Sequence, residues 1–204
     1  MVFLKSPSND FDSSDEEDGV ADQDKLDITW IPLPDRDGEA LGLSALPGCR
    51  FRDVRRSLKF DLDTIVAAGI REVVVLCTDY ELAKYKVSTL IYEYASAGLE
   101  VHHSPIEDGG VPSQSQLAEI CEHLHKSKQP ILIHCYGGLG RSCLVVALFM
   151  MLLNEKLSPD CAIEMMRSLR GPRAIQTVKQ YNMIHGFRDL DVFSDWSSSP
   201  MKSA

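Results

Sequence analysis

Two patterns of apolar and polar positions alternate along the chain: short apolar runs, and apolar residues at helical spacing. Short apolar runs predict buried strands at 28–31, 41–44, 72–77, 101–106 and 131–134. Apolar residues at helical spacing predict helices at 58–68, 80–97 with a break near Val87, 113–126, 141–154, 158–169 and 175–192. Strands that alternate with helices predict an α/β fold with a mostly parallel central sheet, flanked by helices on both faces.

Capping residues support several of the predicted helix ends. Ser113 and Ser158 each stand directly before a helical pattern, where a hydroxyl can accept a bond from an orphan backbone N–H. Pro159 then fits the first turn of its helix. Gly69 and Gly98 follow two other helices and suit their carboxyl ends.

The junction between the strand at 131–134 and the helix from 141 has unusual chemistry. Its residues 134–142 read HCYGGLGRS. A glycine-rich loop that leads into a helix offers backbone N–H groups and the positive end of the helix dipole to an anion. Three glycines let the backbone approach a phosphate closely. The loop is therefore predicted to bind one phosphate through Tyr136, Gly137, Gly138, Leu139, Gly140 and Arg141.

The two ends of this loop carry reactive side chains. Cys135 would attack phosphorus as a thiolate, a form favoured by the loop amides, the helix N-terminus and Arg141. Arg141 would chelate two phosphoryl oxygens with its planar fork. Ser142 is placed to hydrogen-bond the sulfur and ease its departure, and His134 to hold the loop.

A poor leaving group such as an alkoxide needs a proton from a general acid on another loop. Glu107 and Asp108 follow a predicted strand end and precede the flexible pair 109–110, and the resemblance to a phosphatase family described below favours Asp108 over Glu107 by its place relative to these glycines. The alternative is that Asp108 only caps the turn before the next helix. Gln176 is predicted to orient the hydrolytic water, with Gln180 on the same helical face; the alternative is a solvated helix start.

The Cys-x5-Arg arrangement resembles the signature of the cysteine-based protein tyrosine and dual-specificity phosphatases. The resemblance covers most of residues 28–192 and is closest to the kinase-associated group of that superfamily. It rests on the signature loop and on LGLSALPGC at 41–49, DVRR at 53–56, CT at 77–78, ELAKYKV at 81–87, DGG at 108–110 and AIQT at 174–177. Ser44, Arg173 and Glu107 depart from the pattern of that group.

The resemblance implies a cysteine-dependent protein phosphatase that works through a cysteinyl-phosphate and needs no cofactor. Its implied substrate is phosphothreonine, and also phosphotyrosine or phosphoserine. The implied partner is a phosphorylated cyclin-dependent kinase, cleaved in its activation segment, which places the protein in cell-cycle regulation.

Three other functions stay open from the residues. A lipid or inositol phosphatase would profit from lysines in the loop, and residues 136–140 contain none. A non-catalytic phosphate-binding module would need neither Cys135 nor Asp108. A stoichiometric kinase-binding inhibitor with little turnover would need the binding surface alone.

Charge is distributed unevenly along the 204 residues. Residues 10–27 hold nine acidic residues and one lysine, which accounts for −8 of the net charge of −9. We therefore expect a disordered acidic tail at 1–26, a phosphatase domain at 27–193 and a frayed end at 194–204. Ser13 and Ser14 lie in a context that acidophilic kinases can use, although an unmodified tail is an equal alternative.

Composition also limits location and partners. No apolar run approaches the roughly 20 residues that span a bilayer, and no leader sequence is evident, so we expect a cytoplasmic, perinuclear or nuclear protein with reduced cysteines. The absence of a large basic stripe argues against nucleic acid. We expect a monomer. We also expect no metal site, because the spacing of the candidate ligands does not suit a metal ion; these are His102, His103, His123, His125 and Cys135.

Overall fold

The computed structural model describes residues 25–34, 38 and 40–190 of the chain. The predicted acidic tail, including Ser13 and Ser14, lies outside the described residues except at its last two positions, and so does the predicted frayed end. At the start of the described part, Leu26 is already buried among the side chains of one core cluster.

A five-stranded sheet forms the centre of the molecule, in the order β1-β2-β7-β5-β6. These strands are β1 (Thr29–Ile31), β2 (Leu41–Ser44), β7 (Ile131–His134), β5 (Glu72–Val75) and β6 (Glu100–His103). β1 pairs with β2 in the antiparallel sense, and every other pairing in this sheet is parallel. The predicted mostly parallel sheet is confirmed.

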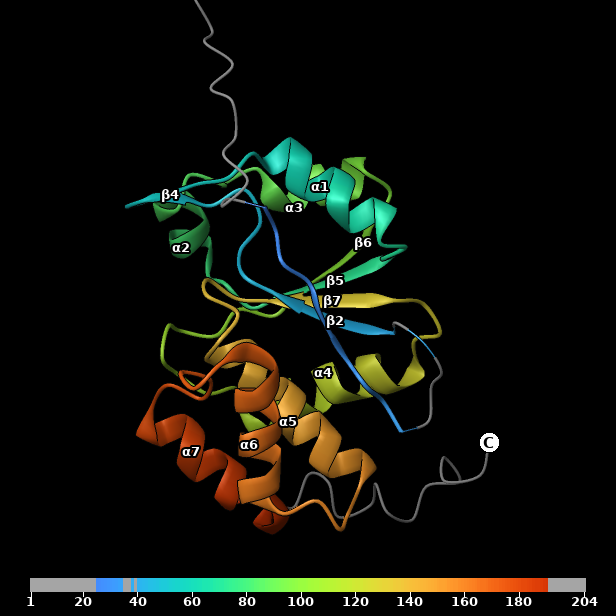
Figure 1. Cartoon of the computed structure of the whole chain (residues 1–204), viewed down its shortest axis with the longest axis vertical. Coiled ribbons are helices and arrows are strands. Elements are labelled where there is room, and N and C mark those ends of the chain that lie inside the picture. Colours follow the sequence, from blue (N-terminus) through green and yellow to red (C-terminus); the bar gives the residue numbers. More distant parts are fainter. Residues whose placement is uncertain (1–24, 35–37, 39, 191–204) are drawn as a thin grey trace, which may run out of the picture.

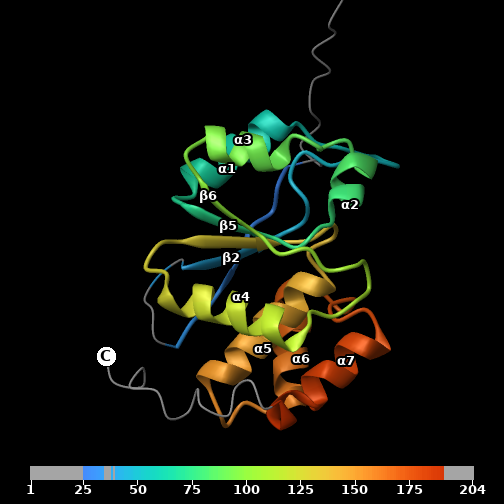
Figure 2. The same ribbon diagram turned by 180° about the vertical axis from the view of Figure 1, so that it is seen from behind.

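Helices cover both faces of this sheet, as Figure 1 and the reverse view in Figure 2 show. On one side lie α1 (Leu58–Ala67) and α3 (Leu90–Ser96), with α2 (Asp79–Lys84) beside the sheet. On the other side lie α4 (Gln114–Lys126), α5 (Arg141–Leu153), α6 (Pro159–Arg170) and α7 (Val178–His185), which the short 3-10 helix η2 (Phe187–Asp189) follows. Within the described part of the chain, no helix combines the length and the apolar character that crossing a bilayer demands.

The sheet divides the core into two clusters, and neighbouring side chains of β7 point into different ones. Ile131 and Ile133 belong to the cluster that contains the side chains of α4, α5 and α6, whereas Leu132 belongs to the cluster under α1 and α3. Every residue of α5 from Arg141 to Leu152 is buried. The helix that begins in the signature loop is therefore the central support of its side of the sheet.

The register of the parallel strands brings their carboxyl ends together. Ser44 of β2 and Val75 of β5 both pair with His134 of β7, and Val75 also pairs with His103 of β6. The loops that follow these strands therefore meet at one edge. Ligands of open α/β sheets bind at this edge, and the signature loop lies there.

Most helix ends agree with the sequence. The Ser113 and Ser158 hydroxyls accept bonds from the backbone N–H groups of Gln116 and Cys161. The predicted break near Val87 is confirmed, because α2 ends before Lys86, whose φ is +64°.

One prediction of local structure was wrong, and one short hairpin was not predicted. The predicted final helix at 175–192 begins only at Val178, after the N-cap Thr177, because Ile175 has a φ of +61° that no helix accepts. Gln176 therefore lies in a loop. The basic stretch at 49–56 contains the hairpin of β3 (Arg50–Phe51) and β4 (Val54–Arg55), for which no strand was predicted. Strands of two residues are too short to show an alternating pattern.

Candidate active site

The signature loop places Cys135 at the carboxyl end of β7 and Arg141 at the first position of α5. Both side chains are almost completely buried. The Cys135 sulfur lies 3.2 Å from the hydroxyl oxygen of Ser142. The predicted thiol–hydroxyl pair is therefore formed, and the hydroxyl can donate a hydrogen bond to a thiolate.

The loop turns its carbonyl groups outward, toward the rest of the protein. Three of them accept bonds from surrounding groups: Tyr136 O from Leu46 N (2.9 Å), Gly138 O from Arg170 Nε (3.3 Å) and Leu139 O from Ile175 N (2.9 Å). In a trans peptide the next N–H points the opposite way. Three backbone N–H groups within 137–140 therefore face the inside of the loop, as an anion site requires.

Close contacts surround two of the loop glycines. Gly138 has a φ of +64°, and a Cβ there would lie 2.5 Å from the carbonyl oxygen of Ser44. A Cβ on Gly140 would lie 2.8 Å from Oε1 of Gln176. The first contact is with fixed backbone, so only glycine fits at 138. The second places the Gln176 amide directly against the loop, where it was predicted to act.

The guanidinium of Arg141 is held in one orientation by a partner that we did not predict. Glu81 accepts a bond from each terminal nitrogen of Arg141, both at 2.6 Å, and Ile106 O accepts a further one at 2.7 Å. Burial alone would raise the pKa of Glu81, but hydrogen bonds from Arg141 and Thr78 outweigh it and hold the pKa below its usual value. The pair is therefore ionised at neutral pH.

This pairing decides which side of Arg141 can bind phosphate. Glu81 takes one N–H from each terminal nitrogen, so the edge formed by Nε and Nη2 is the second bidentate face. Asp108 Oδ1 contacts the Nη2 end of this edge at 3.2 Å. A phosphate bound to this edge of Arg141 would therefore lie in contact with the carboxyl group of Asp108.

The sequence did contain a signal for Glu81. Thr78 and Glu81 form a capping box at the start of α2, directly after the β5 segment. The T-x-x-E spacing would have placed Glu81 at the carboxyl edge of the sheet. What it could not show is that the same carboxylate also reaches Arg141, 60 residues further along.

Asp108 lies at the rim of the site, with its side chain 68% exposed. The N-cap of the next helix, α4, is Ser113. Two hydrogen bonds join the loop of Asp108 to the segment that carries Gln176. The Thr177 hydroxyl donates to Gly109 O at 3.0 Å, and Gln180 Nε2 donates to Gly110 O at 3.2 Å. The loops that carry Asp108 and Gln176 are thus one connected unit.

Gln176 and Gln180 have different surroundings. Gln180 is completely buried, and its Oε1 accepts the backbone N–H of Gln176 at 2.9 Å. Gln176 is exposed, and its amide oxygen lies near Gly140. The arrangement suits Gln176 for contact with a water in the site, and Gln180 for positioning both loops.

His134 has a supporting position behind the nucleophile. It is completely buried, and its Nε2 lies 2.9 Å from the hydroxyl of Tyr94 on α3. Burial lowers the pKa of His134 to about 3. A neutral imidazole in this position holds β7 against α3 and does not exchange protons with substrate.

Comparison with known proteins agrees with this geometry. The family model for Cyclin-dependent kinase inhibitor 3 (CDKN3) matches residues 4–163. The chain is 47% identical to cyclin-dependent kinase inhibitor 3 of Rattus norvegicus over 186 residues, covering 89% of this chain and 88% of the relative. It is 46% identical to the Homo sapiens protein of that name over 194 residues, covering 91% and 92%.

A solved structure extends the agreement to the fold. The crystal structure of kinase associated phosphatase, with its catalytic site cysteine replaced by serine, superposes with a TM-score of 0.77 at 46% identity. It covers 82% of this chain and 96% of that one. The resemblance stated from the signature loop is confirmed, and the chain belongs to the cyclin-dependent kinase inhibitor 3 family of cysteine-based protein phosphatases.

Proposed function

We propose that this protein hydrolyses phosphothreonine in the activation segment of a cyclin-dependent kinase, and phosphotyrosine or phosphoserine as well, through a cysteinyl-phosphate. The observation that carries the proposal is the contact between the Cys135 sulfur and the Ser142 hydroxyl, at the floor of a loop closed by Arg141. The names of the relatives, which refer to cyclin-dependent kinases, support the choice of partner.

In the first step the thiolate of Cys135 attacks phosphorus as the bond from phosphorus to the threonine oxygen breaks. The loop N–H groups and the Nε–Nη2 edge of Arg141 bind the three remaining phosphoryl oxygens. The departing alkoxide takes a proton from Asp108. Substrate phosphate would displace Asp108 from Arg141 and free its carboxyl group for this role.

In the second step water attacks phosphorus and the bond from phosphorus to sulfur breaks. The carboxylate of Asp108 accepts a proton from the water, and Gln176 orients that water from its place beside Gly140. The thiolate that leaves is stabilised by a hydrogen bond from Ser142 at 3.2 Å. Inorganic phosphate is released and Cys135 returns to its starting form.

The surroundings of the loop favour a protein substrate. The interior of the loop contains no lysine for a second phosphate. Beside it, Tyr136 stacks on Tyr85 with ring centroids 4.1 Å apart, and Phe51 meets both rings edge-on. The guanidinium of Arg52 lies 5.4 Å from the Phe51 ring centre. An aromatic wall with a cation at its border suits a peptide segment that carries phosphate.

The direct test is dephosphorylation of the activation-segment phosphothreonine in a cyclin-dependent kinase, with and without bound cyclin. Wild type should release phosphate in many turnovers, and Cys135→Ser should bind the phosphorylated kinase without turnover. A stoichiometric inhibitor would instead suppress the kinase equally well in both forms. Release of phosphate by Cys135→Ser at the wild-type rate would also contradict the proposal.

The oligomeric state and location belong to the same proposal. We propose that the protein acts as a monomer on its kinase, without metal, nucleic acid or membrane in the reaction, in the cytoplasm or nucleus. A sedimentation measurement at the working concentration tests the first point, and a dimer would contradict it. Imaging of the tagged full chain tests the second, and a secreted or membrane-bound signal would contradict it.

A further inference from the structure

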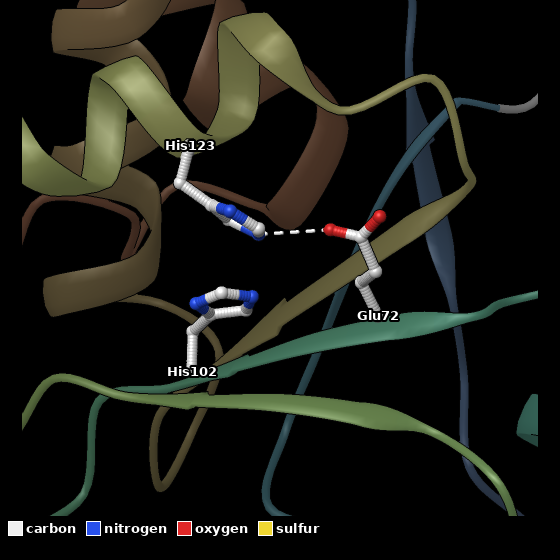
Figure 3. Close-up of side chains that lie close together, drawn as sticks. All are labelled: Glu72, His102 and His123. Carbon is white, nitrogen blue, oxygen red and sulfur yellow. Dashed lines mark ion pairs between the residues drawn. The ribbon is translucent and has the colours of Figure 1, made fainter.

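Two histidines and a glutamate converge at the end of the sheet that is farther from the signature loop. Glu72 begins β5, His102 lies on β6 and His123 on α4, and Figure 3 shows the three side chains directed at one another. One potential ligand atom from each lies within 4.8 Å of the other two. Val75, at the other end of β5, pairs with His134, so Glu72 lies roughly 10 Å along the strand from the active-site end, while His102 is opposite Val74.

Glu72 and His123 lie within ion-pair distance, but the geometry between their two atoms is not that of a hydrogen bond. Glu72 Oε2 and His123 Nε2 are 2.9 Å apart, yet both atoms are buried and neither has a hydrogen-bond partner with suitable geometry among the described residues. The Glu72 side chain is only 9% exposed. A buried carboxylate oxygen without a donor is costly, and a cation between the two atoms would satisfy both.

The charges around the cluster favour a cation. Glu72 Oε2 lies against His123 Nε2, so a carboxylate already faces the imidazole from β5. The two imidazole rings lie close together, with centroids 3.4 Å apart. Glu100 Oε1 lies 3.1 Å from His102 Nε2 and brings a second carboxylate to the same corner.

We propose that Glu72, His102 and His123 bind one divalent transition-metal ion, with Zn²⁺ the best fit. Two imidazoles and one carboxylate are a donor set that Zn²⁺ takes readily, and the fourth position would hold water or Glu100. The Ser127 hydroxyl donates to the other oxygen of Glu72 at 2.6 Å, and so orients the carboxylate as partners of metal ligands do. The ion would fasten α4 to β5 and β6.

Our sequence interpretation found no metal site, and the fold explains why. The three ligands come from three separate elements, so no short spacing connects them. His103, the neighbour of His102, points elsewhere and contacts Cys77 O at 2.8 Å. His125 lies two positions beyond His123, on a different side of α4.

Calorimetric titration of the full chain with Zn²⁺, after removal of metal by a chelator, tests this site. We expect one ion per chain in wild type, in Cys135→Ser and in the matched control His125→Ala. His123→Ala and Glu72→Gln should remove this binding. Ser127→Ala should keep the ligands and lower the affinity about 10- to 100-fold. Thermal unfolding should show Zn²⁺ raising the Tm of wild type, Cys135→Ser and His125→Ala, raising it less in Ser127→Ala, and leaving it unchanged in His123→Ala and Glu72→Gln.

Three results would overturn the proposal. One is a wild-type chain that takes up no Zn²⁺ below millimolar concentration. Another is unchanged binding in both His123→Ala and Glu72→Gln. The third is loss of binding in Cys135→Ser, which would assign the ion to the catalytic thiol. If His123→Ala fails to fold, Glu72→Gln and Ser127→Ala still decide the question, because each keeps the size of its site nearly unchanged.

Discussion

Replacement of Glu81 by glutamine tests the most buried ion pair of the site. Arg141 is 1% exposed and Glu81 is 5% exposed, and removal of one partner from a buried pair costs about 3 to 5 kcal/mol. Ile106 O and Asp108 remain as partners of Arg141. We therefore expect the lower end, about 3 kcal/mol of lost unfolding free energy, or a fall in Tm of about 6 to 12 °C.

The loss should depend on pH in a defined direction. The pKa of Glu81 is lower in the folded protein than its unfolded value near 4.5. Its contribution is therefore complete above about pH 5 and is lost as pH falls through the folded pKa. Glu81→Gln resembles the protonated form, so the stability difference between wild type and variant should shrink below about pH 4.

Urea unfolding at a series of pH values measures this difference, and phosphatase assays on the same samples measure its effect on Arg141. Glu119→Gln is the matched control, because Glu119 is exposed on α4 and should change stability by less than about 0.5 kcal/mol. The catalytic efficiency of Glu81→Gln should fall as Arg141 loses its fixed orientation. A stability loss below about 1 kcal/mol, or one that does not change with pH, would refute the reasoning.

Three further substitutions test other parts of the site. Asp108→Asn should slow cleavage of phosphothreonine far more than cleavage of an aryl phosphate with a good leaving group; equal effects would remove Asp108 from the acid role. Arg141→Lys should weaken phosphate binding and turnover, and full activity in a steady-state assay would exclude the bidentate contact. Gly138→Ala should lower unfolding free energy by at least about 1 to 3 kcal/mol, because its Cβ would meet the Ser44 carbonyl, whereas a Cβ on Gly137 would have open space within 4 Å among the described residues. Urea unfolding of both glycine variants compares them, and equal stability would contradict the contact.

The positions of Cys135, the signature loop and Asp108 could be predicted from the sequence because each depends on local order. The strand at 131–134, the glycines and the helix from Arg141 are adjacent in the chain, so pattern and spacing determine their arrangement. Asp108 could be placed because it follows a strand in the same parallel sheet, and the carboxyl ends of such strands share one edge.

Contacts between distant elements could not be predicted in this way. Glu81 reaches Arg141 from α2, and Glu72 meets His123 across the space between β5 and α4. Such contacts depend on the register of the sheet and on the direction of each side chain, which no local pattern contains. The start of α7 was missed for another reason, since Ile175 adopts a backbone conformation that its side chain disfavours.

The central claim is that phosphate passes through the sulfur of Cys135. Rapid quenching of wild type during turnover of a phosphorylated peptide, followed by peptide mass spectrometry, tests it most directly. We expect phosphate on the peptide that contains Cys135. Its amount should be larger in Ser142→Ala than in wild type, because the sulfur leaves less easily without the hydroxyl. A chain that turns over substrate with no phosphate on Cys135 in either form, or with phosphate on another residue, would contradict it.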